Sequence, residues 1–234
     1  MTQLTVTLAT EPGTPGQPNE DFAAVAPGAA VLLDGVTNRS PDTGCRHGVA
    51  WYARTLGGTL LAAITASPPV PLADALADAI ADVGRLHSGT CDLTSPATPG
   101  ATVVAARADP GGIGYLVLSD SSMVADYGDG RAPVVITDGH RAAAAAPAVA
   151  ASASTGTLEP AGLRGLALLT DGATRITDRF GLLGWPGLLG VLREDGPAAL
   201  IARVRAAEAA DPDRTRWPRG KVTDDATVIW WPRA

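Results

Sequence analysis

The sequence predicts an α+β fold, because short apolar strands and amphipathic helices fall into separate groups along its 234 residues. Strands come first, followed by two helices, a long series of strands, more helices and a last strand. Consecutive strands that are joined by tight turns pair in antiparallel fashion. Helices that follow runs of strands, rather than alternating with them, are typical of layered α+β structures.

The first strands are short and end in polar turns. Residues 4–8 alternate Leu, Thr, Val, Thr and Leu, which predicts a half-buried strand. Proline and glycine then dominate residues 11–18, where we expect a turn. A strand pair over 22–26 and 29–33 follows this turn.

Two helices are predicted next, separated by three prolines at positions 68, 69 and 71. Steps of three and four place one set of apolar residues on a single face of the first helix: Val49, Ala53, Leu56, Leu60 and Ile64. The second helix repeats this spacing with Leu72, Leu76, Ala79, Val83 and Leu86. Its acidic strip, which we interpret as a solvated face rather than a ligand set, consists of Asp74, Asp78 and Asp82.

The second half of the chain begins with a meander. Tight turns at 109–112 and around Asp129–Gly130 predict two hairpins, which join strands 101–107 to 114–119 and 122–127 to 132–137. Residues 140–154 are rich in alanine, and the sequence leaves a helix, a flap and disorder open for them.

A strand over 166–170 precedes two helices, 185–194 and 198–210, and the last strand covers 226–231. We expect Leu200, Ile201 and Val204 on the buried side of the second of these helices. The two tryptophans at 230 and 231 should point to opposite faces of the last strand. Without a repeat or a clear linker, we expect a single domain over residues 1–234.

Composition narrows the range of partners. The net charge of −6 argues against nucleic-acid binding, which needs a basic face. No apolar stretch is long enough to span a membrane, and the first residues lack the features of a signal peptide. Because Cys45 and Cys91 are the only two cysteines, a cytoplasmic chain with free thiols is the default, and one disulfide stays open. We interpret Cys45 and His47 as the start of a helix, too close together and too few for zinc.

The chemically distinctive residues are aspartates at the ends of apolar runs. Asp34, Asp120 and Asp171 each follow such a run, and Asp224 lies just before the last one. A lone aspartate at a strand end is usually a turn former. Four of them held at the rim of a core repel one another unless a cation neutralises them. Ligands that are all oxygen atoms suit Mg²⁺ or Mn²⁺ better than zinc.

These acids belong to an ordered series of short motifs. In chain order they are Asn19-Glu20-Asp21, Asp34-Gly35, Gly100-Ala101-Thr102, Asp120-Ser121, Thr170-Asp171-Gly172 and Asp224-Asp225-Ala226-Thr227. The series resembles the metal-dependent protein phosphatases of the type 2C (PPM) family, especially the bacterial branch, over residues 19–231. The resemblance implies a four-layer α-β-β-α sandwich, in which two antiparallel sheets are flanked by helix pairs.

The resemblance also implies roles for individual residues. Asp34 would bridge two Mn²⁺ or Mg²⁺ ions, with help from the Gly35 carbonyl. Glu20 and Asp21 would bind an ion directly or through its waters. The remaining acids of the series then divide by position: Asp171 and Asp224 would hold the other ion, Asp225 would support the ligands, and Asp120 matches a residue linked to a third, weaker ion.

The implied reaction is phosphomonoester hydrolysis on serine or threonine. Water activated by the two ions attacks phosphorus in line, without a covalent enzyme intermediate, and Asp34 and Asp21 are the acids closest to this chemistry. The implied partner is a phosphorylated protein, either a Ser/Thr kinase or its target.

The chain departs from the family pattern at several positions. Gly16 stands where the family usually has a phosphate-contacting arginine, and Arg175 stands where it often has an aspartate for the third ion. We consider Arg39, Arg46 and Arg175 as substitutes for the missing arginine. These losses leave a second hypothesis open, in which the chain is a weak or inactive relative that binds and regulates a partner. A haloacid-dehalogenase mechanism fails, because Leu32 occupies the position of its nucleophilic aspartate.

Overall fold

The computed structural model describes residues 5–36, 43–66, 69–95, 97–128, 130–138 and 146–233. Its strands form two antiparallel five-stranded sheets. The first has the order β1-β10-β9-β6-β7, in which the bounds are β1 Thr7–Glu11, β10 Ala226–Pro232, β9 Gly165–Leu169, β6 Ser122–Asp126 and β7 Val134–Thr137. The second has the order β2-β3-β4-β5-β8, with β2 Phe22–Ala26, β3 Ala29–Val36, β4 Gly100–Asp109, β5 Gly112–Leu118 and β8 Ser154–Leu158.

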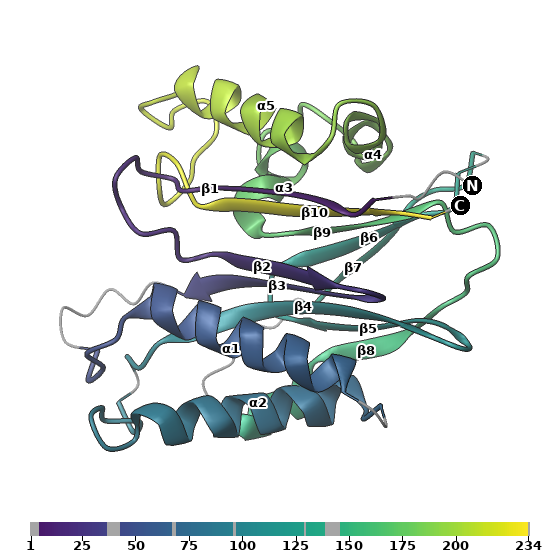
Figure 1. Cartoon of the computed structure of the whole chain (residues 1–234). Helices are drawn as coiled ribbons and strands as arrows, with labels where there is room; N and C mark the ends of the chain where they lie inside the picture. Colours follow the sequence, from purple (N-terminus) through teal and green to yellow (C-terminus); the bar gives the residue numbers. More distant parts are fainter. Residues whose placement is uncertain are drawn as a thin grey trace.

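Helices cover the outer face of each sheet, which gives the four layers of Figure 1. The second sheet is covered by α1 Val49–Thr65 and α2 Leu72–His87. The first sheet is covered by α3 Asp171–Asp178, α4 Trp185–Glu194 and α5 Pro197–Ala209. A short 3₁₀ helix, η1 Pro147–Ser152, packs beside α2. The α+β prediction and its four-layer form are therefore confirmed.

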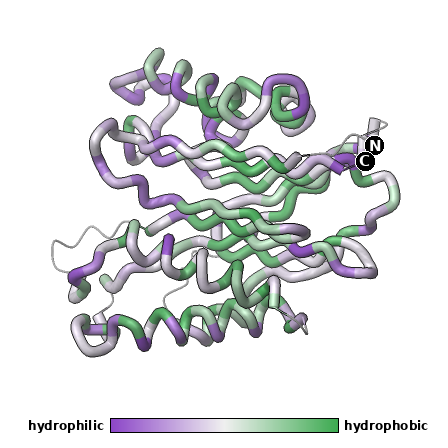
Figure 2. The backbone as a smooth tube through the Cα atoms, viewed as in Figure 1, coloured by the Kyte–Doolittle hydropathy of each residue, from purple (hydrophilic) through white to green (hydrophobic). Residues whose placement is uncertain are grey.

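Three apolar clusters follow from this layering. One lies between α1, α2 and the second sheet, one lies between the first sheet and helices α3 to α5, and one fills the space between the two sheets. Figure 2 shows hydrophobic residues concentrated along the strands of both sheets. Trp230 belongs to the helix-side cluster and Trp231 to the inter-sheet cluster, which confirms that they point to opposite faces.

The helix predictions hold with one exception. Val49, Ala53, Leu56, Leu60 and Ile64 are all buried along α1. On α2 the predicted face is correct up to Val83, but Leu86 is 66% exposed and His87, one position later, is 2% exposed.

Among the described residues, no helix combines the length and the apolar character that crossing a bilayer requires.

Two other predictions need correction, and two elements were missed. The first strand covers Thr7–Glu11 instead of 4–8, because pairing with β10 sets its register and Thr10 hydrogen-bonds Thr227 (Oγ1–Oγ1, 2.7 Å). β3 continues to Val36, so Asp34 lies inside the strand and pairs with Thr102. The polar edge strand β8 and the helix α3 were not predicted, because both are short and poor in apolar residues: β8 (STGTL) has only Leu158, and the eight residues of α3 include only Ala173 and Ile176.

The pairing brings the functional ends of the strands together. Glu11 pairs with Ala226, and Leu169 pairs with both Val228 and Ser122 at one end of the first sheet. Phe22 pairs with Leu33 at one end of the second sheet. In Figure 1 these ends lie on the same side of the sandwich, at the left of the view.

The inter-sheet cluster predicts a large cost for truncating Leu168, which is 0% exposed. Leu168→Ala should lower the free energy of unfolding by about 2–5 kcal/mol, because it removes buried methyl groups and leaves a cavity. Urea unfolding followed by circular dichroism measures this loss. Leu86→Ala on the solvent side of α2 is the control, and an equal loss for both variants would contradict the assignment of this core.

Candidate functional site

A cavity of about 750 Å³ opens at the end of the sandwich where the strand ends meet. Five aspartates line it: Asp34 of β3, Asp120 between the sheets, Asp171 and Asp178 at the two ends of α3, and Asp224 before β10. The fold thus brings together acids that are up to 190 positions apart in the sequence, from Asp34 to Asp224. Oxygen atoms gathered in this way form a site for hard cations.

Each acid reaches the cavity from a different kind of backbone. Asp34 lies two residues before the end of β3, and Asp171 is the first residue of α3. Asp120 follows Ser119, whose φ of 73° turns the chain from the second sheet toward the first. Ser121 then hydrogen-bonds Thr102 of β4 (Oγ–Oγ1, 2.5 Å), which fixes this crossing beside Asp34.

The acids strongly disfavour one another's ionised forms. Burial, followed by the charges of Asp21, Asp171, Asp224 and Asp120, raises the pKa of Asp34 well above its ordinary value. Burial and the charges of Asp224 and Asp120 also raise the pKa of Asp171, which lies within hydrogen-bonding reach of Asp34. A cluster of carboxylates in this state is stabilised by a bound cation.

Asp21 lies behind this cluster, 4% exposed. Burial, with the charges of Asp225 and Asp171, raises its pKa to about 7. Its Oδ2 accepts a hydrogen bond from Thr170 Oγ1 at 3.0 Å, whereas its Oδ1 is buried with no hydrogen-bond partner in the part of the chain that the structure describes. A buried carboxylate oxygen without a partner is costly. The donor set therefore fits divalent cations with oxygen ligands.

Glu20 and Asp225 lie next to the main cavity, along a second cavity of about 250 Å³. The Asp225 carboxylate accepts hydrogen bonds from the backbone amides of Gly13 at 2.7 Å and Glu20 at 2.6 Å. Both Asp225 oxygens are thereby used to hold the turn that carries Glu20 and Asp21. This arrangement agrees with a supporting position for Asp225.

Two glycines allow the backbone to approach closely at this site. A side chain at Gly35 would collide with Val49 of α1 and with the backbone of Glu20. A side chain at Gly172 would collide with the carbonyl oxygen of Asp225. The glycine that follows each of Asp34 and Asp171 thus lets the neighbouring acidic segment pack against the cavity.

Asp224 differs from the other acids, because basic side chains already engage it. Arg175 Nη2 lies 2.6 Å from one carboxylate oxygen and Lys221 Nζ lies 2.7 Å from the other. Arg175 also contacts Glu208, which is 0% exposed, at 2.8 Å. The position where the family often has an aspartate is therefore occupied by a buried arginine that pairs with one of the expected metal ligands.

The three arginines considered for phosphate contact have different surroundings. Arg39 lies outside the described residues. Arg46 has an exposed side chain and is not among the described residues that line the cavity. Arg175 lines the cavity but is committed to Asp224 and Glu208. Arg179, which the sequence gave no reason to select, also lines the cavity and is exposed.

The structure also gathers four side chains that the sequence did not connect: Cys45, His47, His87 and Cys91. The interpretation of Cys45 and His47 as a mere helix start was therefore incomplete. The burial of His87 would have pointed to this cluster. The sequence instead placed Leu86 on the buried face of α2, so His87 was not expected to face inward.

The two sheets, their helix layers and the carboxylate-lined cavity define the class of α-β-β-α phosphatase folds. The Protein phosphatase 2C family model matches residues 13–192, and the chain belongs to this family. The resemblance found in the sequence is thus confirmed.

Solved structures show the same fold at low sequence identity. The PPM Ser-Thr phosphatase MsPP from Mycobacterium smegmatis is 18% identical with a TM-score of 0.68, and 99% of each chain is covered. PppA, a regulatory component of T6SS in Pseudomonas aeruginosa, is 20% identical with a TM-score of 0.64, covering 98% of this chain and 97% of its own. The serine/threonine phosphatase Stp1 from Staphylococcus aureus is 14% identical with a TM-score of 0.60, covering 100% and 96%. No curated protein matches the sequence significantly.

The raised pKa of Asp21 predicts how stability depends on pH in the absence of divalent cations. Between about 4 and about 7, the folded chain binds more protons at Asp21 than the unfolded chain does, so stability should fall as pH rises through this range. Melting temperatures of chelator-treated protein measure this slope. Mn²⁺ should flatten it, and Asp21→Asn should make it less steep without metal, because the raised pKa values of Asp34 and Asp171 still contribute. A slope that neither change affects would contradict the assignment.

Proposed function

We propose that this chain is an active Mg²⁺- or Mn²⁺-dependent phosphatase that hydrolyses phosphoserine and phosphothreonine in proteins. The observation that carries the proposal is the convergence of Asp34, Asp171 and Asp224 on one cavity, where burial, followed by repulsion between the carboxylates, raises the pKa of the first two. Membership of the Protein phosphatase 2C family agrees with this chemistry.

Within this proposal the acids divide the binding of two ions. Asp34, supported by the Gly35 carbonyl, would contact both. Asp21 and Glu20 would serve one ion, and Asp171 and Asp224 the other. When bound, the ions would supply the Lewis acidity that activates water and offsets negative charge on the phosphoryl oxygens. The chain contributes a rigid set of ligands, because each is held by a strand, a helix start or a hydrogen-bonded turn.

The substrate side of the cavity supports a phosphoryl group. Arg179 is exposed at the cavity wall, so its guanidinium is available to bind phosphate oxygens, for which its planar donors are well suited. The cavity is open to solvent and more polar than apolar in its lining. These properties favour a phosphorylated residue on a protein surface over a buried small apolar ligand.

Asp120, which also lines the cavity, would bind a third, weaker ion.

A second function is favoured by one observation. Arg175 and Lys221 neutralise Asp224, so that a metal ion must compete with two cations for this carboxylate. The chain would then bind metal weakly and act as a phosphatase-like module that binds and regulates a partner protein. The two functions differ in whether the chain hydrolyses a phosphomonoester when metal is present.

Replacing the proposed bridging ligand separates them. Wild-type protein should hydrolyse an aryl phosphate in Mn²⁺ and lose this activity in chelator, and Asp34→Asn should reduce kcat at least about 100-fold, because the site loses the charge shared by both ions. Asp82→Asn, on the solvated face of α2, is the control and should retain full activity. If the wild-type protein does not hydrolyse the aryl phosphate in Mn²⁺, the result supports the regulatory module. Turnover that persists in Asp34→Asn would contradict the proposed centre.

Arg175→Met predicts opposite effects on metal binding and on stability. Asp224 loses one competing cation, so half-maximal activity should need less Mn²⁺. Among the residues that the structure describes, the carboxylate of buried Glu208 then keeps only Arg205, at 2.7 Å, so the free energy of unfolding should fall by about 2 kcal/mol.

Manganese titrations and urea unfolding measure these two effects. Arg193→Met is the control, because Arg193 pairs with buried Asp126 along a separate cavity, whose described lining includes none of the five aspartates of the main cavity. It should lower stability without changing the response to Mn²⁺. An unchanged or higher requirement for Mn²⁺ in Arg175→Met would show that Arg175 does not compete with the ion.

A further inference from the structure

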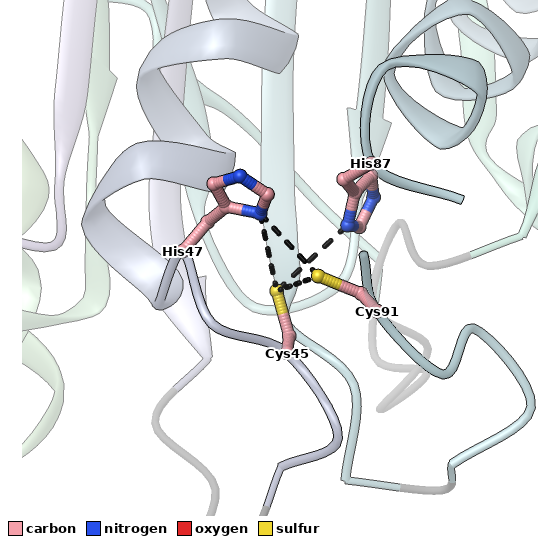
Figure 3. Close-up of side chains that lie close together, drawn as sticks. All are labelled: Cys45, His47, His87 and Cys91. Carbon is pink, nitrogen blue, oxygen red and sulfur yellow. Dashed lines mark hydrogen bonds between the residues drawn. The ribbon is translucent and has the colours of Figure 1, made fainter. Parts of the chain in front are cut away.

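Two cysteines and two histidines meet where the paired helices α1 and α2 begin and end. Cys45 and His47 lie just before α1, which starts at Val49. His87 is the last residue of α2, and Cys91 follows it in a turn. Figure 3 shows the four side chains pointing toward one another. The spacing is Cys-X-His in one segment and His-X₃-Cys in the other.

The distances between their ligand atoms match a tetrahedral site. Cys45 Sγ lies 3.4 Å from Cys91 Sγ, 3.9 Å from His47 Nδ1 and 3.7 Å from His87 Nδ1. Cys91 Sγ lies 3.4 Å from His47 Nδ1, and all four atoms lie within 4.8 Å of one another. Zinc bonds of about 2.3 Å to sulfur and about 2.0 Å to nitrogen give tetrahedron edges of about 3.4–3.8 Å.

Aromatic packing fixes both imidazole rings. Trp51, one turn into α1, stacks on His47 with ring centroids 4.2 Å apart and an interplanar angle of 24°. The same indole meets the edge of His87 at 5.3 Å, and Tyr52 lies on another side of His87 at 6.3 Å. The rings therefore present Nδ1 to the sulfurs without first having to be ordered, which favours binding.

The backbone holds the two segments together. The amide of Asp92 donates to the Gly44 carbonyl at 2.8 Å across the segments, and the amide of Cys91 donates to the His87 carbonyl at 3.0 Å within the turn. Backbone hydrogen bonds from His47 and Gly48 reach the Cys45 sulfur, and those from Arg46 and His47 reach the Cys91 sulfur. At Cys45 burial outweighs these donors and raises the pKa of the thiol, whereas at Cys91 the donors outweigh burial and lower it, which favours the thiolate that a metal requires.

We propose that Cys45, His47, His87 and Cys91 bind one Zn²⁺ ion. Two thiolates and two imidazoles in a tetrahedron are a ligand set typical of zinc. Four protein ligands fill its coordination, so that no position remains for water or substrate and the site is structural. Binding releases the proton of each thiol to solvent and leaves both histidines neutral, which balances the step.

This site is separate from the proposed phosphatase centre. The acids of the main cavity offer oxygen ligands, and none of the four cysteine and histidine residues is among the described residues that line it. The proposal therefore does not depend on phosphatase activity, and either can fail without the other.

The ion would nevertheless stabilise the scaffold of the active end. It links the start of α1 to the end of α2, two segments that are about 40 residues apart in the chain. Val49, two residues after His47, packs so closely on Gly35 that no side chain fits there. Zinc would thus hold α1 against the strand that carries Asp34. Its loss should lower the melting temperature.

The competing chemistry is a disulfide between Cys45 and Cys91. Their sulfurs are 3.4 Å apart, whereas a disulfide requires about 2.0 Å, and both thiols are free in this structure. A disulfide would not need either histidine, so that histidine variants distinguish the two.

The experiment measures metal in full-length protein purified under reductant, loaded with zinc and dialysed. We expect about one tightly bound zinc per chain. X-ray absorption should show two sulfur and two nitrogen neighbours. Replacement by Co²⁺ should give the thiolate charge-transfer band and the strong visible bands of a tetrahedral site. Because the chain has only two cysteines, that band reports on this cluster alone.

Variants assign the ion to these residues. His47→Gln should lower zinc content at least about tenfold, because one ligand is lost while both cysteines remain. Ser88→Ala, in the same turn as Cys91 but without a ligand, is the matched control and should bind zinc like the wild type. Asp34→Asn should also retain zinc.

Three results would overturn the proposal. The first is reduced wild-type protein that has two reactive thiols and binds no zinc. The second is a first shell of oxygen and nitrogen only, with no thiolate band in the Co²⁺ form. The third is zinc that His47→Gln retains but Asp34→Asn loses, which would place the ion among the acids.

Discussion

Electrostatic repulsion among carboxylates at one end of the sandwich is the constraint on which the rest of this structure depends. Asp34 and Asp171 lie within reach of each other, and burial keeps solvent from screening them. Such a cluster opposes folding unless protons or cations neutralise it. The three apolar clusters supply the stability that holds the acids in place. The cost of gathering these charges is the physical reason to expect ions between them.

The surroundings of the acids are as specific as the acids themselves. Asp225 uses both of its oxygens to hold the turn before β2, and glycines after Asp34 and Asp171 allow neighbouring segments to approach. Arg175 reduces the repulsion within the same cluster, because its positive charge on Asp224 supplies part of the neutralisation that a metal would otherwise provide. Under the proposed function, the balance between the guanidinium and the ions would decide whether the site turns over substrate or only binds it.

Much of this architecture could be predicted from the sequence, and the failures have physical causes. Periodicity placed α1, α2, α4 and most strands, because their apolar faces are continuous. It failed for β8 and α3, which are short and contain only one and two apolar residues respectively. Local pattern also could not reveal the meeting of Cys45 with Cys91, which depends on the pairing of two helices. The order of the motifs was enough to select Asp34 and Asp171 as candidate site residues. The ion pair between Arg175 and Asp224 became visible only in the folded structure.

The most direct test is anomalous diffraction from a crystal soaked in Mn²⁺. The account predicts two strong manganese peaks in the cavity, with Asp34 between them and Asp171 and Asp224 on one of the two ions. It also predicts that Arg175 moves away from Asp224. Well-ordered density in which the carboxylates of Asp34 and Asp171 lie at hydrogen-bonding distance from each other, with no anomalous peak near either, would contradict the account.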